Sequence, residues 1–166
     1  MLIKDLLRNG LTFMRPSCGI FQIGEKALET ILTFIQDEPH KLESGGVLLG
    51  RHILNTNDIV VDQVTIPMTG DRRRHSSFFR SHVPHQVQIN QAWDNSKGTC
   101  TYLGEWHTHA EPVPTPSVID RVDWQRKLLV DKFSECLFFL IFGTENICVW
   151  EGGYRSIFLR QLRRVD

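Results

Sequence analysis

The sequence predicts a fold of the mixed α/β class, of the α+β type, in which a mainly antiparallel sheet is flanked by about three helices. Length favours one domain, because 166 residues suit a single hydrophobic core. Composition favours a folded chain, since apolar residues make up 41% and charged residues 23%. The apolar pattern predicts about seven strands among the helices. We therefore expect a single domain that spans residues 1–166.

The N-terminal part of the chain is predicted to form a strand, a helix and a hairpin. Residues 17–23 favour a short strand, and residues 25–36 favour an amphipathic helix that ends before Pro39. The apolar positions at helical spacing in this helix are Leu28, Ile31, Leu32 and Ile35. Residues 46–53 and 59–66 are rich in strand formers and are separated by Asn-Thr-Asn-Asp, which tolerates turn geometry. We expect a β-hairpin there.

The middle of the chain alternates between strands and helices. A polar, arginine-rich loop over residues 69–77 leads to a short strand at 78–82, and a helix follows with Pro84 in its first turn and runs to about Asn95. Ser96-Lys97-Gly98 ends that helix, and residues 101–107 favour another strand.

A proline-rich loop over residues 110–116 separates that strand from a helix at 117–130. This helix is expected to turn four apolar side chains towards the core, namely Val118, Val122, Leu128 and Leu129. Residues 137–142 and 147–150 then favour a second hairpin. Gly152-Gly153 is predicted to turn the chain into a last strand at 155–162.

Charge and hydropathy exclude several classes of partner and location. Lysine plus arginine and aspartate plus glutamate are equal at 19 each, so neither nucleic acid nor an anionic membrane is expected as a partner. The longest apolar run, residues 136–142, is far shorter than the roughly 20 residues that cross a bilayer. The N-terminus, with Asp5, lacks a signal-peptide pattern. We expect a cytoplasmic protein.

The spacing of the four cysteines also favours a cytoplasmic location. They are scattered without a C-x-x-C spacing, which favours reduced thiols over a disulfide framework or a cysteine zinc site. They are Cys18, Cys100, Cys136 and Cys148. Most of them are expected to be small buried hydrophobic side chains.

The segment from His107 to Asp120 has the pattern H-x-H-x7-S-x2-D. Residues two apart on a strand point to the same face, so His107 and His109 can converge on one ion, and imidazole suits zinc. Thr115 is a good N-cap, which places Ser117 and Asp120 on one face of the following helix. Three protein ligands would leave a fourth tetrahedral position for water, as in catalytic zinc sites, and a nearby carboxylate would have to move its proton.

Each piece of this pattern has an ordinary structural explanation. Ser-x-x-Asp at a helix start is also a capping box, and two histidines on a strand are commonly surface residues or bonded to protein partners. The combination at this spacing, on a strand, a proline-rich loop and a helix, favours a metal site instead.

These residues resemble the signature of the JAMM metallopeptidases, also called MPN-plus or JAB domains, over nearly the whole chain. The block Glu43-Ser44-Gly45-Gly46-Val47-Leu48-Leu49-Gly50 is similar to the family's segment around its glutamate. The resemblance implies a single JAB/MPN domain with a curved, cytidine-deaminase-like sheet. It also implies one Zn²⁺ with a bound water as the nucleophile, held by His107, His109 and Asp120. In this family the glutamate, here Glu43, is the general base and the serine, here Ser117, donates to the oxyanion.

The resemblance further implies a protein substrate. JAMM domains hydrolyse the peptide or isopeptide bond after the extended C-terminal tail of a conjugated protein. Ala110, where eukaryotic deubiquitinases usually carry proline, and the Val113-Pro114-Thr115-Pro116 loop are similar to the prokaryotic branch. Within that branch the chain resembles the JAB-type isopeptidases of type II CBASS anti-phage operons, which release a cGAS-like nucleotidyltransferase from its conjugates.

Three other functions remain open at this point. The chain could process a ubiquitin-like or sulfur-carrier protein, or it could be a non-catalytic MPN scaffold, although such scaffolds typically lack a ligand. A nuclease would need a basic groove, which the net charge does not favour.

Several further residues carry weaker signals. The basic run Arg72-Arg73-Arg74-His75 indicates either a solvated loop or, by resemblance, a substrate contact. Glu111 is expected in solvent rather than on the metal, and Asp123 is expected to favour the positive N-terminus of its helix. Trp106, next to His107, could wall the site. The histidines without a partner at ligand spacing are His52, His82 and His85.

Overall fold

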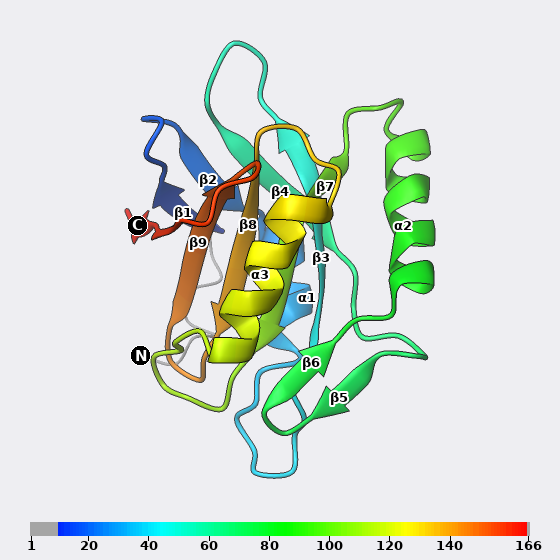
Figure 1. The fold of residues 1–166 in the computed structure, drawn as a ribbon, viewed down its shortest axis with the longest axis vertical. Coiled ribbons are helices and arrows are strands. Elements are labelled where there is room, and N and C mark those ends of the chain that lie inside the picture. The colour runs from blue at the N-terminus through cyan, green and yellow to red at the C-terminus, as the bar shows by residue number, and fades with distance from the viewer. Residues whose placement is uncertain (1–9, 166) are drawn as a thin grey trace.

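A computed structural model describes residues 10–165. Residues 1 and 166, the two ends of the predicted domain, lie outside this range. So do the N-terminal residues that were used to predict location. Within it, nine strands form one sheet in the order β10-β9-β8-β7-β3-β4-β2-β1-β11, and β5 and β6 form a separate two-stranded sheet (Figure 1). The strands are β1 (Leu11–Met14), β2 (Ile20–Ile23), β3 (Gly45–His52), β4 (Ile59–Val64), β5 (Arg72–Arg74), β6 (Ser77–Phe79), β7 (Thr101–Thr108), β8 (Cys136–Phe142), β9 (Ile147–Gly153), β10 (Leu159–Gln161) and β11 (Arg163–Arg164).

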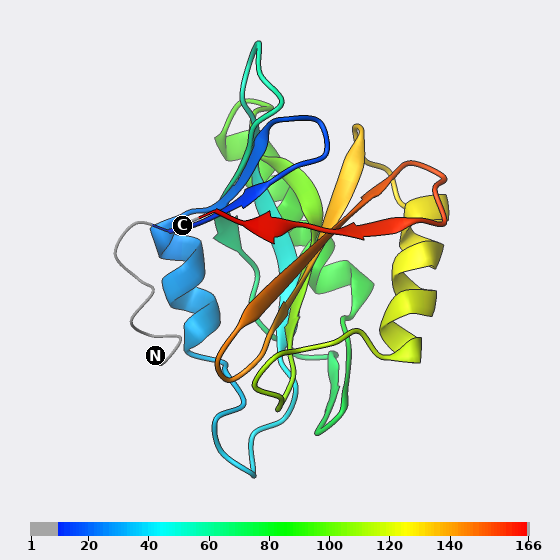
Figure 2. The same cartoon turned by 90° about the vertical axis from the view of Figure 1, so that its left-hand side faces the viewer.

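The large sheet is strongly curved. Its two outer strands, β10 and β11, are consecutive in the chain, so residues 159–164 bridge from β9 at one side to β1 at the other (Figure 2). Arg15, just after β1, forms an ion pair with Glu151 on β9 at 2.8 Å and strengthens this bridge. The predicted α+β fold with a curved sheet is confirmed. Most neighbouring strands are antiparallel as expected, but β2–β4 and β7–β8 are parallel.

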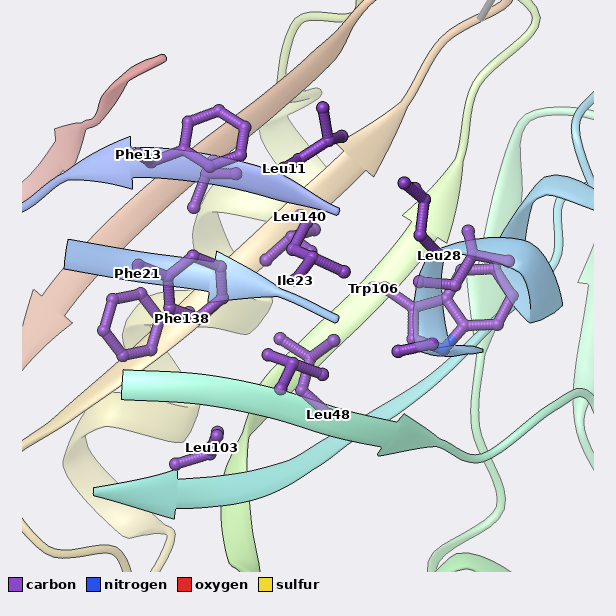
Figure 3. Close-up of a cluster of buried hydrophobic side chains, with 14 of the residues drawn as sticks. Leu11, Phe13, Phe21, Ile23, Leu28, Leu48, Leu103, Trp106, Phe138 and Leu140 are labelled. Atoms are coloured by element: carbon purple, nitrogen blue, oxygen red, sulfur yellow. The ribbon is translucent and has the colours of Figure 1, made fainter. Parts of the chain in front are cut away.

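Three helices cover the two faces of the sheet: α1 (Glu25–Leu32), α2 (His82–Asn95) and α3 (Val118–Val130). In Figure 2, α1 and α3 lie on opposite sides of the sheet. Strand β8 separates two cores by its alternation, because Phe138 and Leu140 join the cluster on the α1 side while Leu137 and Phe139 join the cluster on the α3 side. Figure 3 shows the α1-side cluster. Within residues 10–165 none of these helices is long and apolar enough to cross a bilayer.

Two predictions about the helices were wrong. Helix α1 ends at Leu32 instead of residue 36, because the amides of Thr33 and Phe34 bond back to carbonyls three residues earlier and tighten the last turn. In α3 the buried residues are Trp124, Lys127 and Leu128. Of the four side chains predicted to face the core only Leu128 does, while Val118, Val122 and Leu129 are exposed. The apolar residues of α3 lie on all sides of the helix, so their spacing does not define one apolar face. The packing of Trp124 on Phe139 decides which side of the helix is buried.

Several strand boundaries also differ from the prediction. The arginine-rich loop contains β5, and the predicted strand at 78–82 is β6 over Ser77–Phe79, with His82 already in α2. Gly152 and Gly153 belong to β9, and the last predicted strand, 155–162, shrinks to β10 after a turn. Strands β1 and β11 were not predicted. Short strands at the sheet margins carry little periodicity of their own, and their pairing partners lie far away in the sequence.

The cysteines agree with the expectation of reduced thiols. All four are free, and three of them are buried, whereas Cys18 is exposed.

Candidate metal centre

Glu43 lies next to His109 because of the register between β3 and β7. These strands are antiparallel, and the chain continues their pairing one step beyond β3. There the amide of Thr108 donates to the carbonyl of Ser44 at 2.9 Å, and the amide of Ser44 donates to Oγ1 of Thr108 at 3.0 Å. The next position on each strand brings Oε1 of Glu43 to 3.6 Å from Nε2 of His109. The glutamate and the histidines therefore meet on the same side of the sheet.

The two histidines converge as their spacing predicted. They lie two residues apart at the end of β7, and their Nε2 atoms are 3.1 Å from each other. His107 is 8% exposed and His109 is 6% exposed, so both imidazoles are buried. Glu43 is equally buried, at 4%. One ligand atom from each of these three residues lies within 4.8 Å of the others.

Asp120 reaches the same point from the start of α3. Its Oδ1 lies 3.2 Å from Nε2 of His107, and its Oδ2 lies 3.4 Å from Nε2 of His109. Oδ2 also accepts a hydrogen bond from the amide of Ser117 at 2.7 Å, while Ser117 Oγ accepts one from the amide of Asp120 at 3.1 Å. The capping box and the approach to the histidines are thus both present. Ser117 is itself the N-cap, so the prediction that Thr115 caps this helix was wrong.

This donor set fits a tetrahedral zinc ion. With zinc–ligand distances of about 2.0 to 2.1 Å, neighbouring ligand atoms stand about 3.3 Å apart. The two Nε2 atoms are 3.1 Å apart, and the Asp120 carboxylate approaches them with different oxygens, Oδ1 at 3.2 Å from His107 and Oδ2 at 3.4 Å from His109. Two imidazole nitrogens and one carboxylate are also the ligand types that catalytic zinc uses. Asp120 contacts both imidazoles, whereas Glu43 comes within ion-pair distance of His109 alone and lies at the edge of the triangle.

The pKa values of the two carboxylates, Glu43 and Asp120, are shifted in opposite directions. Burial raises the pKa of Glu43 to about 8, although the nearby charge of His109 opposes the shift. Burial also acts to raise the pKa of Asp120, but hydrogen bonds from His107 and His109 outweigh it and hold the pKa well below its usual range. In the metal-free site, burial thus favours the protonated form of Glu43, whereas the two imidazoles favour the ionised form of Asp120.

The side chain of Glu111 is 46% exposed, in line with the expectation that it lies in solvent, but it also contacts His109. Oε1 of Glu111 is 3.1 Å from Nδ1 of His109, on the other side of the ring from Nε2, which faces His107 and Asp120. Thr115 donates to the other carboxylate oxygen at 3.4 Å. Such an outer partner sets the tautomer and orientation of a ligand histidine. The sequence feature that could have predicted this contact is the position of Glu111, two residues after the candidate ligand His109.

Aromatic rings surround the site differently from the expectation. Trp106 points away into the α1-side core, where its ring packs near Phe34 and Phe142 (Figure 3). The ring of Trp124 on α3 lies 6.2 Å from that of His107 instead. The wall of the site is therefore Trp124, because alternation along β7 turns Trp106 to the opposite face from His107.

Two other residues with weak sequence signals have structural partners. Asp123 forms ion pairs with Arg126 and Lys127 on its own helix. His85 is completely buried, with Nδ1 2.7 Å from Thr65 Oγ1 and Nε2 3.0 Å from Asp71. These contacts account for both side chains without a catalytic role.

A comparison with protein families identifies the class of protein. The model of the family described as prokaryotic homologs of the JAB domain matches residues 25–152. That range contains Glu43, His107, His109, Ser117 and Asp120. The chain belongs to this family.

Curated relatives share one name, CD-NTase/cGAS isopeptidase. A relative from Vibrio cholerae serotype O1 is 40% identical over 156 residues, which cover 94% of this chain and 96% of the relative. One from Escherichia coli strain TW11681 is 34% identical over 141 residues, covering 85% and 87%. Among solved structures, a Desulfitobacterium hafniense protein is similar with a TM-score of 0.54 at 22% identity, over 84% of this chain and 87% of that one. This last similarity concerns the fold.

Proposed function

We propose that this protein is a zinc-dependent isopeptidase that hydrolyses the bond after the C-terminal tail of a conjugated protein. Its substrate is a cGAS-like nucleotidyltransferase attached through that tail, and its setting is cytoplasmic CBASS antiviral defence. Membership of the JAB family and the shared name of three relatives, each an isopeptidase for a CD-NTase or cGAS, support this assignment.

The observation that carries the proposal is the convergence of Glu43, His107, His109 and Asp120. These residues come from three separate segments of the chain. Nε2 of His109 lies 3.1 Å from Nε2 of His107, 3.4 Å from Asp120 and 3.6 Å from Glu43, and Nε2 of His107 lies 3.2 Å from Asp120. A non-catalytic scaffold would not require a complete donor set with a second carboxylate beside it. A buried group of this kind costs stability and is expected where chemistry occurs.

The proposed ligands of the single Zn²⁺ are His107, His109 and Asp120. When bound, the ion lowers the pKa of a coordinated water to about 7 and polarises the carbonyl group. The chain supplies the ligand geometry: the end of β7 presents both imidazoles, and the capping box of α3 orients Asp120. Glu111 orients the His109 ring from behind.

Glu43 is the proposed general base and acid. Its carboxylate accepts a proton from the water whose oxygen forms the new bond to the carbonyl carbon. When the carbon–nitrogen bond breaks, Glu43 returns that proton to the departing lysine amine, so the proton count balances. Ser117 is the proposed oxyanion donor, because its Oγ accepts from the Asp120 amide and its own hydrogen is still available to donate.

The experiment that tests this function measures zinc and cleavage together. The substrate is a cGAS-like nucleotidyltransferase joined through its C-terminal carboxyl group to the lysine side chain of a reporter protein. We expect about one zinc per chain, cleavage at the junction, and loss of cleavage on chelation with recovery on adding Zn²⁺. If the protein cleaved only a ubiquitin-like or sulfur-carrier conjugate, the proposed substrate would be wrong and that conjugate would take its place. A zinc-loaded protein that cleaves none of the three would refute the enzyme assignment.

A further inference from the structure

We propose that Arg73 is a positioning residue that holds the main chain of Glu43 from the β5–β6 hairpin. In Figure 1 this hairpin lies beside the chain that leads into β3. The inference builds on the proposed role of Glu43 and assigns a function to one member of the arginine run. It separates Arg73 from its two neighbours, which the sequence alone does not do.

Strand alternation explains why Arg73 differs from Arg72. Arg72 pairs with Phe79, and its guanidinium carbon lies 5.3 Å from the centre of that ring. Arg73 pairs with Phe78 and therefore points to the other face of the hairpin. That face is turned towards the start of β3, where Glu43 lies.

The hairpin holds both main-chain groups of Glu43. The amide of Glu43 donates to the carbonyl of Arg74 at 2.8 Å. Nε of Arg73 donates to the carbonyl of Glu43 at 2.9 Å, and its Nη2 donates to Oγ of Ser44 at 2.5 Å. One guanidinium thus spans the peptide unit that follows Glu43, with the fork geometry that arginine has and lysine lacks.

A second set of contacts ties the hairpin to the strand of the histidines. Gln36 is 3% exposed, and its Nε2 donates to the carbonyl of His75 in the hairpin turn at 3.1 Å. Its Oε1 accepts from Oγ1 of Thr108, the residue between the two histidines, at 3.3 Å. The hairpin, Glu43 and the end of β7 are therefore one connected hydrogen-bond network.

Close packing also seats the hairpin on β3. A Cβ atom on Gly45 would lie 2.6 Å from the ring of Phe78, far inside contact distance. Only glycine allows the ring to approach the backbone there. The hairpin therefore rests on the strand that begins just after Glu43, which keeps Arg73 within reach of its acceptors.

Loss of the hydrogen bonds from Arg73 to Glu43 and Ser44 should reduce turnover more than substrate affinity. A catalytic group displaced by about 1 Å can lose on the order of 100-fold in rate, because proton transfer requires alignment with the reacting atoms. The Glu43 side chain would remain, but its backbone would lose one of two tethers. The zinc ligands would be unaffected, since none of them bonds to the hairpin.

The test compares Arg73→Ala with Arg73→Lys and Arg74→Ala in the zinc-loaded protein. Arg74→Ala removes the same charge from the same strand but keeps the carbonyl that accepts the Glu43 amide. For each variant we would measure zinc content, kcat and KM on the reporter conjugate, and hydrogen exchange at the amides of Glu43 and Ser44. Exchange does not depend on activity, so it tests the anchor even if the proposed substrate is wrong.

For Arg73→Ala we expect kcat to fall about 100-fold, KM to change less than about threefold, zinc to stay bound and both amides to exchange faster. Arg73→Lys should recover part of kcat, and Arg74→Ala should keep both kcat and slow exchange. A raised KM at unchanged kcat would make Arg73 a docking residue and overturn the proposal. Equal effects of Arg73→Ala and Arg74→Ala would reduce it to a general charge effect. If Arg73→Ala does not fold, Arg73→Lys decides between these outcomes.

Discussion

The carboxylate of Glu43 lies 3.6 Å from Nε2 of His109, and the pairing of β3 with β7 places it there. This relationship separates two tasks within one small site. Glu43 stands beside the proposed zinc ligands, whereas His109 is one of them. Substitution of each residue should therefore have a distinct signature.

Glu43→Gln should keep zinc and lose cleavage. The amide fills the same volume but cannot accept the proton of the attacking water, so we expect kcat to fall by about 10² to 10⁴-fold. Glu29→Gln, on the exposed side of α1, is the matched control and should behave as wild type. Single-turnover kinetics with metal analysis measure both quantities. Wild-type kcat in the glutamine variant would assign the base to another residue.

His109→Ala should abolish metal binding, and Glu111→Ala should only lower the metal affinity. The first change removes a proposed ligand, while the second frees the outer nitrogen of that ring, which typically costs about 10 to 100-fold in metal affinity. Glu111→Gln retains an acceptor for Nδ1 and serves as the control. Competition against a chelator gives the three affinities. Equal zinc affinity of Glu111→Ala and wild type would argue that the contact at 3.1 Å does not orient the ligand.

Ser117 offers a way to separate helix capping from catalysis. Ser117→Ala should cost about 1 kcal/mol of stability because the capping acceptor is lost, whereas Ser117→Gly should cost only a few tenths. Both variants lack the hydroxyl donor, so both should lose about 10² to 10³-fold in kcat. Thermal unfolding and kinetics on the same preparations check this. If kcat followed the loss of stability instead, with Ser117→Gly nearly as active as wild type, Ser117 would be a cap alone.

The buried ion pairs of Glu105 should make the fold sensitive to acid. Nζ of Lys127 is 2.6 Å from Glu105, and Arg80 contacts its other oxygen. Burial acts to raise the pKa of Glu105, but the charges of Lys127 and Arg80 outweigh it and hold the pKa below its ordinary value. Because the folded pKa is the lower one, this stability is complete above the unfolded pKa of about 4.3 and is lost as pH falls through the folded pKa.

Glu105→Gln tests that dependence. At neutral pH it should destabilise the fold by about 3 kcal/mol, since it removes one partner of buried charges, and its Tm should fall less than that of wild type between about pH 6 and about pH 3. Asp62→Asn, in an exposed pair with Arg51, is the control and should change stability by less than about 1 kcal/mol. Parallel pH profiles for Glu105→Gln and wild type would contradict the assignment.

The parts of the fold predicted well are those with strong local periodicity. Strands β3, β4 and β7 lie close to their predicted bounds, and α2 ends at Asn95 as expected. The exposed face of α3 was predicted wrongly because Val118, Val122 and Leu129 are as apolar as the residues that pack. Only the sheet beneath the helix, through Phe139 against Trp124, selects the buried side. Strand β5 was missed because three consecutive arginines carry no alternation of polarity.

The sequence by itself supplied the proposed zinc ligands, because two histidines at strand spacing suit one ion and the resemblance of the whole segment to the JAMM signature adds Asp120. The tertiary structure decided which other groups join them. Glu43 reaches His109 through strand register, Trp124 replaces Trp106 as the wall, and Arg73 alone of its run turns towards Glu43. Each of these depends on pairing or packing between segments that are distant in the chain, and local spacing carries no information about such contacts.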